Sequence, residues 1–153
     1  MEAEEVQKQC LELMEESKAA YLTTIDPEGF PITRAMFNLR NKEQFPEFVE
    51  FFKKQENQFV VYISTNTSSS KITHIKQNPK ISVYFCDADE FKGVMFGGIA
   101  EIVEDRELKH KIWLDWWDRY YREGIDDPDY SLVRLKPKQA RFYYKLNQVN
   151  FEL

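Results

Sequence analysis

The sequence contains few of the residues that build disulfide frameworks or metal sites. Its two cysteines, Cys10 and Cys86, lie far apart and form no C-x-x-C motif, so we expect two buried thiols in a cytoplasmic protein. Its two histidines, His74 and His110, have no partner at a metal-ligand spacing, which indicates surface or core residues. The acidic run 126–129 lacks the twelve-residue spacing and the closing glutamate of a calcium loop, and we interpret it as a turn and a helix stop. We therefore expect no metal site.

Long apolar runs and a surplus of basic residues are also missing. The longest apolar runs are only a few residues, against about 20 for a membrane span, and the acidic residues 1–5 are unlike a signal peptide. The formal net charge of −5 argues against a general nucleic-acid binder, although 21 lysines and arginines leave room for a local anion pocket. We expect a cytoplasmic chain that binds neither nucleic acid nor membrane.

Large side chains are abundant. The chain is 42% hydrophobic and 15% aromatic, too rich in such residues to be disordered. Its 153 residues predict one domain, spanning residues 1–153, with one substantial core.

Hydrophobic spacing predicts a mainly β domain with peripheral helices (α+β). The pattern indicates helices over 2–16, 44–56 and 71–77 and from 105 to about 121, and strands over 19–25, 31–39, 59–65, 80–87 and 93–103, with a last pair within 132–144. Short connections between consecutive strands favour an antiparallel sheet, and about six strands close most naturally into a small barrel. Gly97 and Gly98, inside a strand, indicate a bulge, a bend or the close approach of another group.

Aromatic side chains gather in the predicted helix 105–121. Trp113, Trp116, Trp117 and Tyr120 follow the spacing i, i+3, i+4, i+7 and would form one wide face. That face could pack on the sheet, form a dimer interface or stand beside a flat ring.

Two cations and a polar loop indicate an anion site. The loop 64–71 leaves a buried strand, is rich in hydroxyls and enters a short helix at Lys71, which is the physical arrangement that binds phosphate. A plain capped loop is the alternative. Arg34 lies inside an apolar strand and needs an anionic partner, which is either a protein carboxylate or a phosphate shared with Lys71.

These features occur together in one known family. The motifs are the hairpin residues 22–24, 29–31 and 34–36, followed by 63–65 and 70–72, then 78–83 and 97–103, the Trp-rich helix and residues 127–130. In this order and spacing the sequence resembles the pyridoxamine 5'-phosphate oxidase-like, FMN-binding split-barrel proteins, in particular the general stress protein 26-like branch. The resemblance runs through most of the chain and implies a six-stranded antiparallel split β-barrel.

The resemblance also implies a cofactor site for FMN. It assigns the flavin phosphate to Arg34, Ser69, Ser70 and Lys71, the isoalloxazine ring to the backbone of Ala35, Met36 and Phe37, and the ring and ribityl chain to Ser64 and Thr65. It further implies a homodimer with the cofactor at the subunit interface.

Two departures from the family pattern argue against oxidation of pyridoxamine 5'-phosphate itself. Gly93 stands where the true oxidases carry a glutamine that contacts the flavin, and residues 145–153 do not supply their basic C-terminal segment. We expect an FMN-dependent oxidoreductase of a small-molecule substrate, with NAD(P)H as a candidate electron donor and no assignable catalytic side chain. The alternatives are a carrier or sensor module that holds flavin, deazaflavin or haem without turnover, and a cofactor-free dimer.

Overall fold

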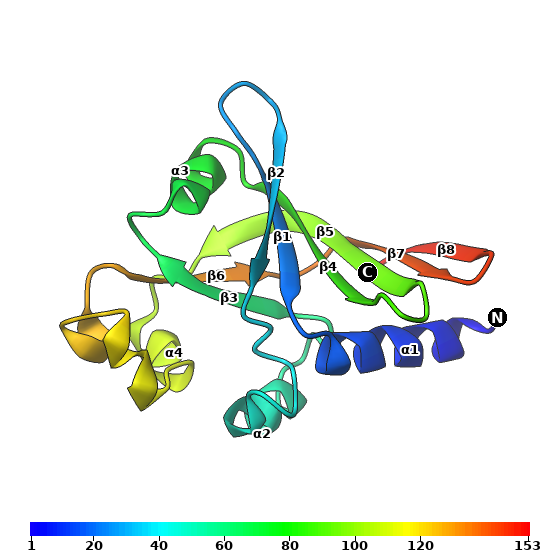
Figure 1. Cartoon of the computed structure of the whole chain (residues 1–153), viewed down its shortest axis with the longest axis horizontal. Helices are drawn as coiled ribbons and strands as arrows, with labels where there is room; N and C mark the ends of the chain where they lie inside the picture. Colours follow the sequence, from blue (N-terminus) through cyan, green and yellow to red (C-terminus); the bar gives the residue numbers. More distant parts are fainter.

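The computed structural model describes residues 1–153 and is organised around one antiparallel sheet (Figure 1). Its strands are β1 (Ala20–Ile25), β2 (Pro31–Met36), β3 (Val61–Asn66), β4 (Lys80–Asp87), β5 (Lys92–Ile102), β6 (Tyr130–Leu135), β7 (Gln139–Tyr144) and β8 (Asn147–Glu152). They follow the order β2-β1-β4-β5-β6-β3, with β7 paired to β5 and β8 paired to β7. The two ends of this order, β2 and β3, are not paired with each other, so the sheet curls into a half-barrel that is split between them. The predicted fold class is confirmed.

The sheet has eight strands rather than six, because residues 147–152 form a strand that the sequence did not indicate. Tyr144 pairs with Asn147, which leaves only Lys145 and Leu146 in the turn. Such a turn needs a positive φ and normally carries glycine or asparagine, whereas here Lys145 has a φ of 55°.

The helices lie around the sheet. They are α1 (Ala3–Glu16), α2 (Val49–Lys53), α3 (Ser70–Gln77) and α4 (Arg106–Lys111), with 3-10 turns at Pro46–Phe48, Asp115–Arg119 and Gly124–Asp126. The longest, α1, has 14 residues, and no helix combines the length and the apolar character that crossing a bilayer requires. The helix predicted over 44–56 is shorter than expected: it consists of the 3-10 turn Pro46–Phe48 followed by α2. It cannot begin at residue 44 because Phe45 has non-helical backbone angles.

The side chains of β4 alternate between the core and the outer face of the sheet, as expected. Ile81, Val83 and Phe85 are buried inside the half-barrel. Cys86 shares the outer face with Tyr84 and is only half-buried, so the expectation that both thiols are buried holds for Cys10 alone.

The glycine pair in β5 permits a close approach. A side chain at Gly98 would meet the backbone nitrogen of Lys138 at 3.3 Å and Leu135 Cδ1 at 3.1 Å. On one side of this point β5 pairs with β7, and on the other it pairs with β6. The missing side chains at Gly97 and Gly98 therefore let the β6–β7 connection lie against β5.

β2 ends at Met36, before the predicted Leu39. The side-chain nitrogen of buried Asn38 donates to the carbonyls of Met14 and Ser17, each at 2.8 Å. These bonds satisfy carbonyls at the end of α1, and they turn the chain away from the sheet.

The prediction of one helix from 105 to 121 is wrong. Asp105 caps α4 as expected, its carboxylate accepting from the Leu108 nitrogen at 3.2 Å, but the helix ends at Lys111. Ile112 and Leu114 are both buried, and residues two apart share a face only in extended backbone. The Tyr130 hydroxyl also donates to the carbonyl of Ile112, which a continuing helix would occupy.

Candidate functional site

A cavity of about 550 Å³ opens in the split between β2 and β3, which are not paired with each other. Six of the nine residues predicted for the cofactor line it: Ala35, Met36, Phe37, Ser64, Thr65 and Lys71. Its remaining lining residues are Lys18, Ala19, Gln44, Asn66, Trp117, Tyr120 and Tyr121. No carboxylate, histidine or cysteine is among them, and the titratable side chains of the lining are Lys18, Lys71, Tyr120 and Tyr121.

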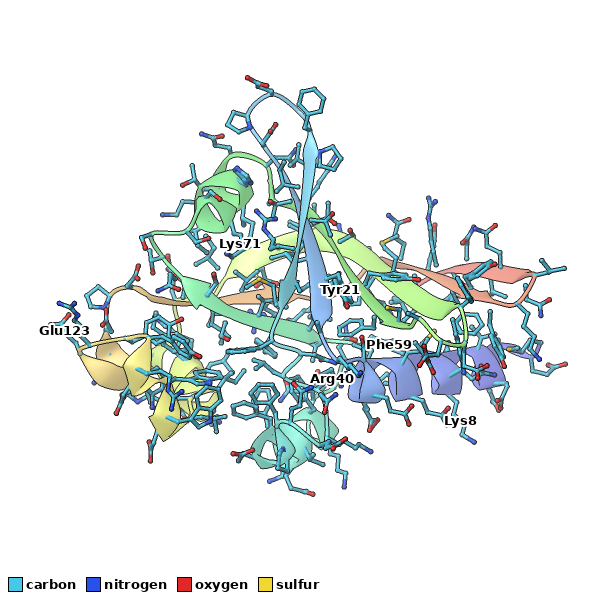
Figure 2. All side chains as sticks on the ribbon, in the orientation of Figure 1. Lys8, Tyr21, Arg40, Phe59, Lys71 and Glu123 are labelled. Carbon is cyan, nitrogen blue, oxygen red and sulfur yellow. The ribbon has the colours of Figure 1, made fainter.

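Arg34 and Lys71 form the cationic end of the site. Lys71 lies on the side of α3 that faces the β1–β2 hairpin, which carries Arg34 on its second strand (Figure 2). Neither cation forms a salt bridge with a carboxylate, although both side chains are half-buried. Burial, together with the nearby charge of Arg34, lowers the pKa of Lys71, and burial lowers the pKa of Arg34. Two neighbouring cations without a carboxylate partner form a candidate anion site, called the anion seat below.

Ser69 and Ser70, which were also predicted to bind the phosphate, lie next to Lys71 at the start of α3 but do not line the cavity. Ser69 is the N-cap of α3, and its Oγ accepts from the Lys71 backbone nitrogen at 3.1 Å. Ser70 begins the helix and is exposed. The candidate seat therefore combines the charges of Arg34 and Lys71 with the two serines at the start of α3, where the helix dipole is positive.

Asp129 holds the loop that leads into the seat, a role that the sequence did not reveal. Its carboxylate accepts from Asn66 Nδ2 at 2.7 Å and from the Ser68 backbone nitrogen at 2.8 Å. The hydrogen bonds from Asn66 and Ser68 lower the pKa of Asp129. Its backbone carbonyl also accepts from the Thr67 nitrogen at 2.7 Å. Within the acidic run 126–129, Asp129 thus anchors the loop 66–68 by hydrogen bonds, in addition to the role of the run as a turn.

Thr24 and His74 extend the seat and were not assigned a role from the sequence. Arg34 Nη1 donates to Thr24 Oγ1 at 2.7 Å, and the same oxygen lies 2.9 Å from His74 Nδ1. Nη1 also donates to the carbonyl of Ile32 at 2.7 Å. These contacts fix one end of the guanidinium and leave its remaining N–H groups for a ligand. The signal in the sequence was the helical spacing of Lys71 and His74, three residues apart on α3.

Aromatic side chains form one wall of the cavity. Trp117 is 1% exposed and belongs to the core, yet it also lines the cavity with Tyr120 and Tyr121. Phe37 contacts Tyr120 and Trp116, with ring centroids 6.4 and 6.0 Å apart. Burial, followed by the nearby carboxylates of Asp129 and Asp127, raises the pKa of Tyr121 to about 12. Of the roles considered for the Trp-rich segment, core packing occurs at Trp117, and a place beside a flat ring stays a prediction.

The fold and the site define a class: a split β-barrel with an anion seat beside a cavity that has an aromatic wall. A sequence profile described as pyridoxamine 5'-phosphate oxidase matches residues 6–144. General stress protein 26 of Bacillus subtilis (strain 168) is 24% identical over 144 residues, 92% of this chain and 90% of that protein. The structure of a Clostridium acetobutylicum protein related to it, of the pyridoxinephosphate oxidase family, is 31% identical with a TM-score of 0.78, over 100% of this chain and 97% of that one. The chain belongs to the pyridoxamine 5'-phosphate oxidase family.

A heme binding protein from Mycobacterium smegmatis shares the fold alone. It is 15% identical, with a TM-score of 0.68 over 96% of this chain and 57% of its own. Cofactor identity therefore does not follow from the fold and has to be argued from the site.

The structure explains the departure at Gly93. A Cβ there would lie 2.0 Å from the hydroxyl of Tyr84, whose ring covers the glycine on the outer face of the sheet. A glutamine at this position would require Tyr84 to move. The C-terminal residues that lack the basic segment form β8, which pairs only with β7.

Proposed function

We propose that this protein binds FMN, with the flavin phosphate in the anion seat. The observation that carries the proposal is that Arg34 and Lys71 are neighbouring, half-buried cations without a carboxylate partner. A dianionic phosphate relieves the repulsion between them and accepts hydrogen bonds from the guanidinium, the ammonium and the two serine hydroxyls. Ser69 and Ser70 can donate because their hydroxyl protons are not used within the protein.

The cavity next to the seat suits the rest of the cofactor. Its volume of about 550 Å³ is within the range of small-molecule sites, and it joins the seat at Lys71. The backbone of Ala35–Phe37 and the side chains of Ser64 and Thr65 would contact the isoalloxazine and ribityl groups. When bound, FMN supplies hydride or electron transfer, while the chain binds, orients and shields it.

We further propose that the protein is an oxidoreductase acting on a small molecule, with NAD(P)H as a candidate electron donor. The absence of carboxylates and histidines from the cavity lining supports chemistry performed by a cofactor. A homodimer with the cofactor at the subunit interface is part of the same proposal. It is supported by the exposed edge strand β2 and by the partly exposed aromatic side chains of Tyr84 and Tyr143 on the outer face of the sheet.

A titration with FMN tests the proposal. We expect quenching of flavin fluorescence that saturates at one FMN per chain, and a dimer mass by light scattering. Bound flavin that NADH or NADPH reduces with turnover in the presence of acceptors supports the enzyme. A protein that leaves FMN fluorescence unchanged refutes the flavin assignment.

A non-catalytic carrier is the second candidate, because a lining without carboxylates or histidines also suits binding without turnover. Flavin that binds but is not reduced at a useful rate would favour it. A titration with haem separates the cofactors. The lining offers no histidine or cysteine to iron, and Met36 is its one thioether. We therefore expect weak haem binding and tight FMN binding.

A further inference from the structure

A second pocket, which shares no residue with the FMN cavity, lies between α1, α2 and the segment after β2. It has a volume of about 190 Å³. Arg40 is placed there, between the end of α1 and α2 (Figure 2). The lining residues are Leu11, Glu15, Arg40, Lys42, Val49, Phe52, Lys53, Gln55 and Gln58.

Arg40 is a buried cation without a carboxylate. It is 8% exposed, and its Nη1 and Nη2 both donate to the carbonyl of Gln58, at 2.7 and 2.9 Å. The Phe52 ring lies 4.5 Å from the guanidinium carbon, and Met14 Sδ lies 3.8 Å from Nη1. Neutral partners compensate a buried charge poorly, and burial lowers the pKa of Arg40 to about 10.

One nitrogen of this guanidinium has no partner. The Nε atom of Arg40 is buried and makes no hydrogen bond, unlike Nη1 and Nη2. Arg106 illustrates how Nε and Nη2 together bind a carboxylate: these two atoms donate to the two oxygens of Asp126, at 3.0 and 2.9 Å. In Arg40 the Nε–H is unpartnered and Nη2 has donated one of its two hydrogens to Gln58, so the Nε–H and the second Nη2 hydrogen are left for a planar anion.

The charges around the pocket favour an anion. Three cations line it, Arg40, Lys42 and Lys53, against the single carboxylate of Glu15, which is already paired with Lys42. Lys53 contacts only Glu50, at 3.4 Å, and both of these side chains are largely exposed. The net charge of the lining is therefore positive in a chain whose net charge is −5.

We propose that this pocket binds a small organic carboxylate, whose oxygens accept hydrogen bonds from the Nε–H and the remaining Nη2 hydrogen of Arg40. Leu11, Val49 and Phe52 provide apolar surface for the body of the ligand. A cavity of about 150 Å³ holds a benzene ring. The pocket of about 190 Å³ therefore takes a ring or a short branched chain together with its carboxylate. Inorganic phosphate lacks the apolar body and would leave those three side chains uncovered.

Benzoate is the probe, and the full-length protein without FMN is the sample. The arginine Nε–H signals in a ¹H–¹⁵N spectrum report the contact directly. We expect the Arg40 Nε–H signal, assigned by its loss in Arg40→Lys, to shift with saturation as benzoate is added. Benzamide, which has the same shape without the charge, should leave it in place. An unmoved signal, or an equal shift with benzamide, overturns the proposal.

Variants localise the binding without removing the buried arginine. Val49→Phe fills the pocket and should abolish the shift, while the rest of the spectrum shows that the chain is folded. Lys53→Ala should weaken benzoate binding about two- to fivefold, as expected for a partly exposed charge. Its neighbour Lys54 does not line the pocket, so Lys54→Ala should bind as the parent does. Equal affinities in Lys53→Ala and Lys54→Ala, with binding retained in Val49→Phe, would place benzoate elsewhere and refute the site.

Discussion

The variant Lys71→Met distinguishes the effect of the anion seat on protein stability from its effect on FMN affinity. In the ligand-free chain, burial and the charge of Arg34 both oppose the ammonium of Lys71. Methionine keeps an unbranched apolar side chain and removes that charge. We therefore expect the free energy of unfolding of the ligand-free protein to stay the same or to rise, while the affinity for FMN falls.

The size of the fall follows from the contact that is lost. One hydrogen bond between a charged group and a ligand contributes about 1.5–3 kcal/mol, which corresponds to roughly 10- to 150-fold in the dissociation constant. Arg34→Met should cost a similar factor. The double variant should cost less than the product of the two, because both cations contact the same phosphate.

Two controls isolate the phosphate contact. Lys76 is an exposed lysine near the other end of α3, and Lys76→Met should leave FMN affinity unchanged within about twofold. Riboflavin lacks the phosphate, so its affinity should not differ between the parent and Lys71→Met. Fluorescence titration measures both affinities, and urea denaturation measures stability. Equal losses for FMN and riboflavin, or a ligand-free Lys71→Met that is clearly less stable, would show that Lys71 has a structural role and that the seat is misassigned.

Three further predictions concern stability. Gly93→Ala should cost about 1–3 kcal/mol by urea denaturation, because its Cβ would lie 2.0 Å from the Tyr84 hydroxyl, and the cost should vanish in a Tyr84→Ala background. Trp117→Ala should cost about 3–5 kcal/mol because the side chain is 1% exposed, whereas Trp116→Ala, at a position 41% exposed, should cost under about 1 kcal/mol; equal costs would contradict the assignment of Trp117 to the core. Burial raises the pKa of Cys10 from 9.0 to about 12. Above pH 9 the unfolded thiol loses its proton while the folded one keeps it, so the free energy of unfolding should fall by up to about 1.4 kcal/mol per pH unit, and Cys10→Ala should remove that part of the slope.

Local patterns in the sequence predicted most of the sheet, because alternating burial is a property of each strand by itself. β4 has the predicted bounds, and α1 and β1 begin one residue later than predicted. Two of the errors occur where a contact from a distant segment decides the backbone conformation. Asn38 ends β2 by bonding to carbonyls of α1, and Tyr130 occupies the carbonyl at which the predicted Trp-rich helix would continue. Neither contact leaves a periodic signal in the sequence.

The site divides in the same way. Arg34 and Lys71 could be singled out because a charge inside an apolar strand and a lysine at a helix start are locally unusual. Thr24 and Asp129 could not, because an ordinary strand threonine and one carboxylate of an acidic turn acquire their roles only through Arg34 and Ser68, each distant from them in sequence.

The edge position of β2 links ligand binding to local opening of the barrel. β2 pairs only with β1, and the tip of the hairpin projects beyond the sheet (Figure 1). Arg34 is on this strand, whereas Lys71 belongs to α3, and in the ligand-free chain the hairpin and α3 are joined through Thr24, which contacts both Arg34 and His74. A bound anion adds a second connection between these two elements. Fraying of the hairpin then competes directly with binding, and the ligand-free chain should exchange its β2 amide hydrogens much faster than those of β4 or β5. The measured affinity includes the cost of holding this hairpin closed, so a substitution at its tip can weaken binding without touching the ligand.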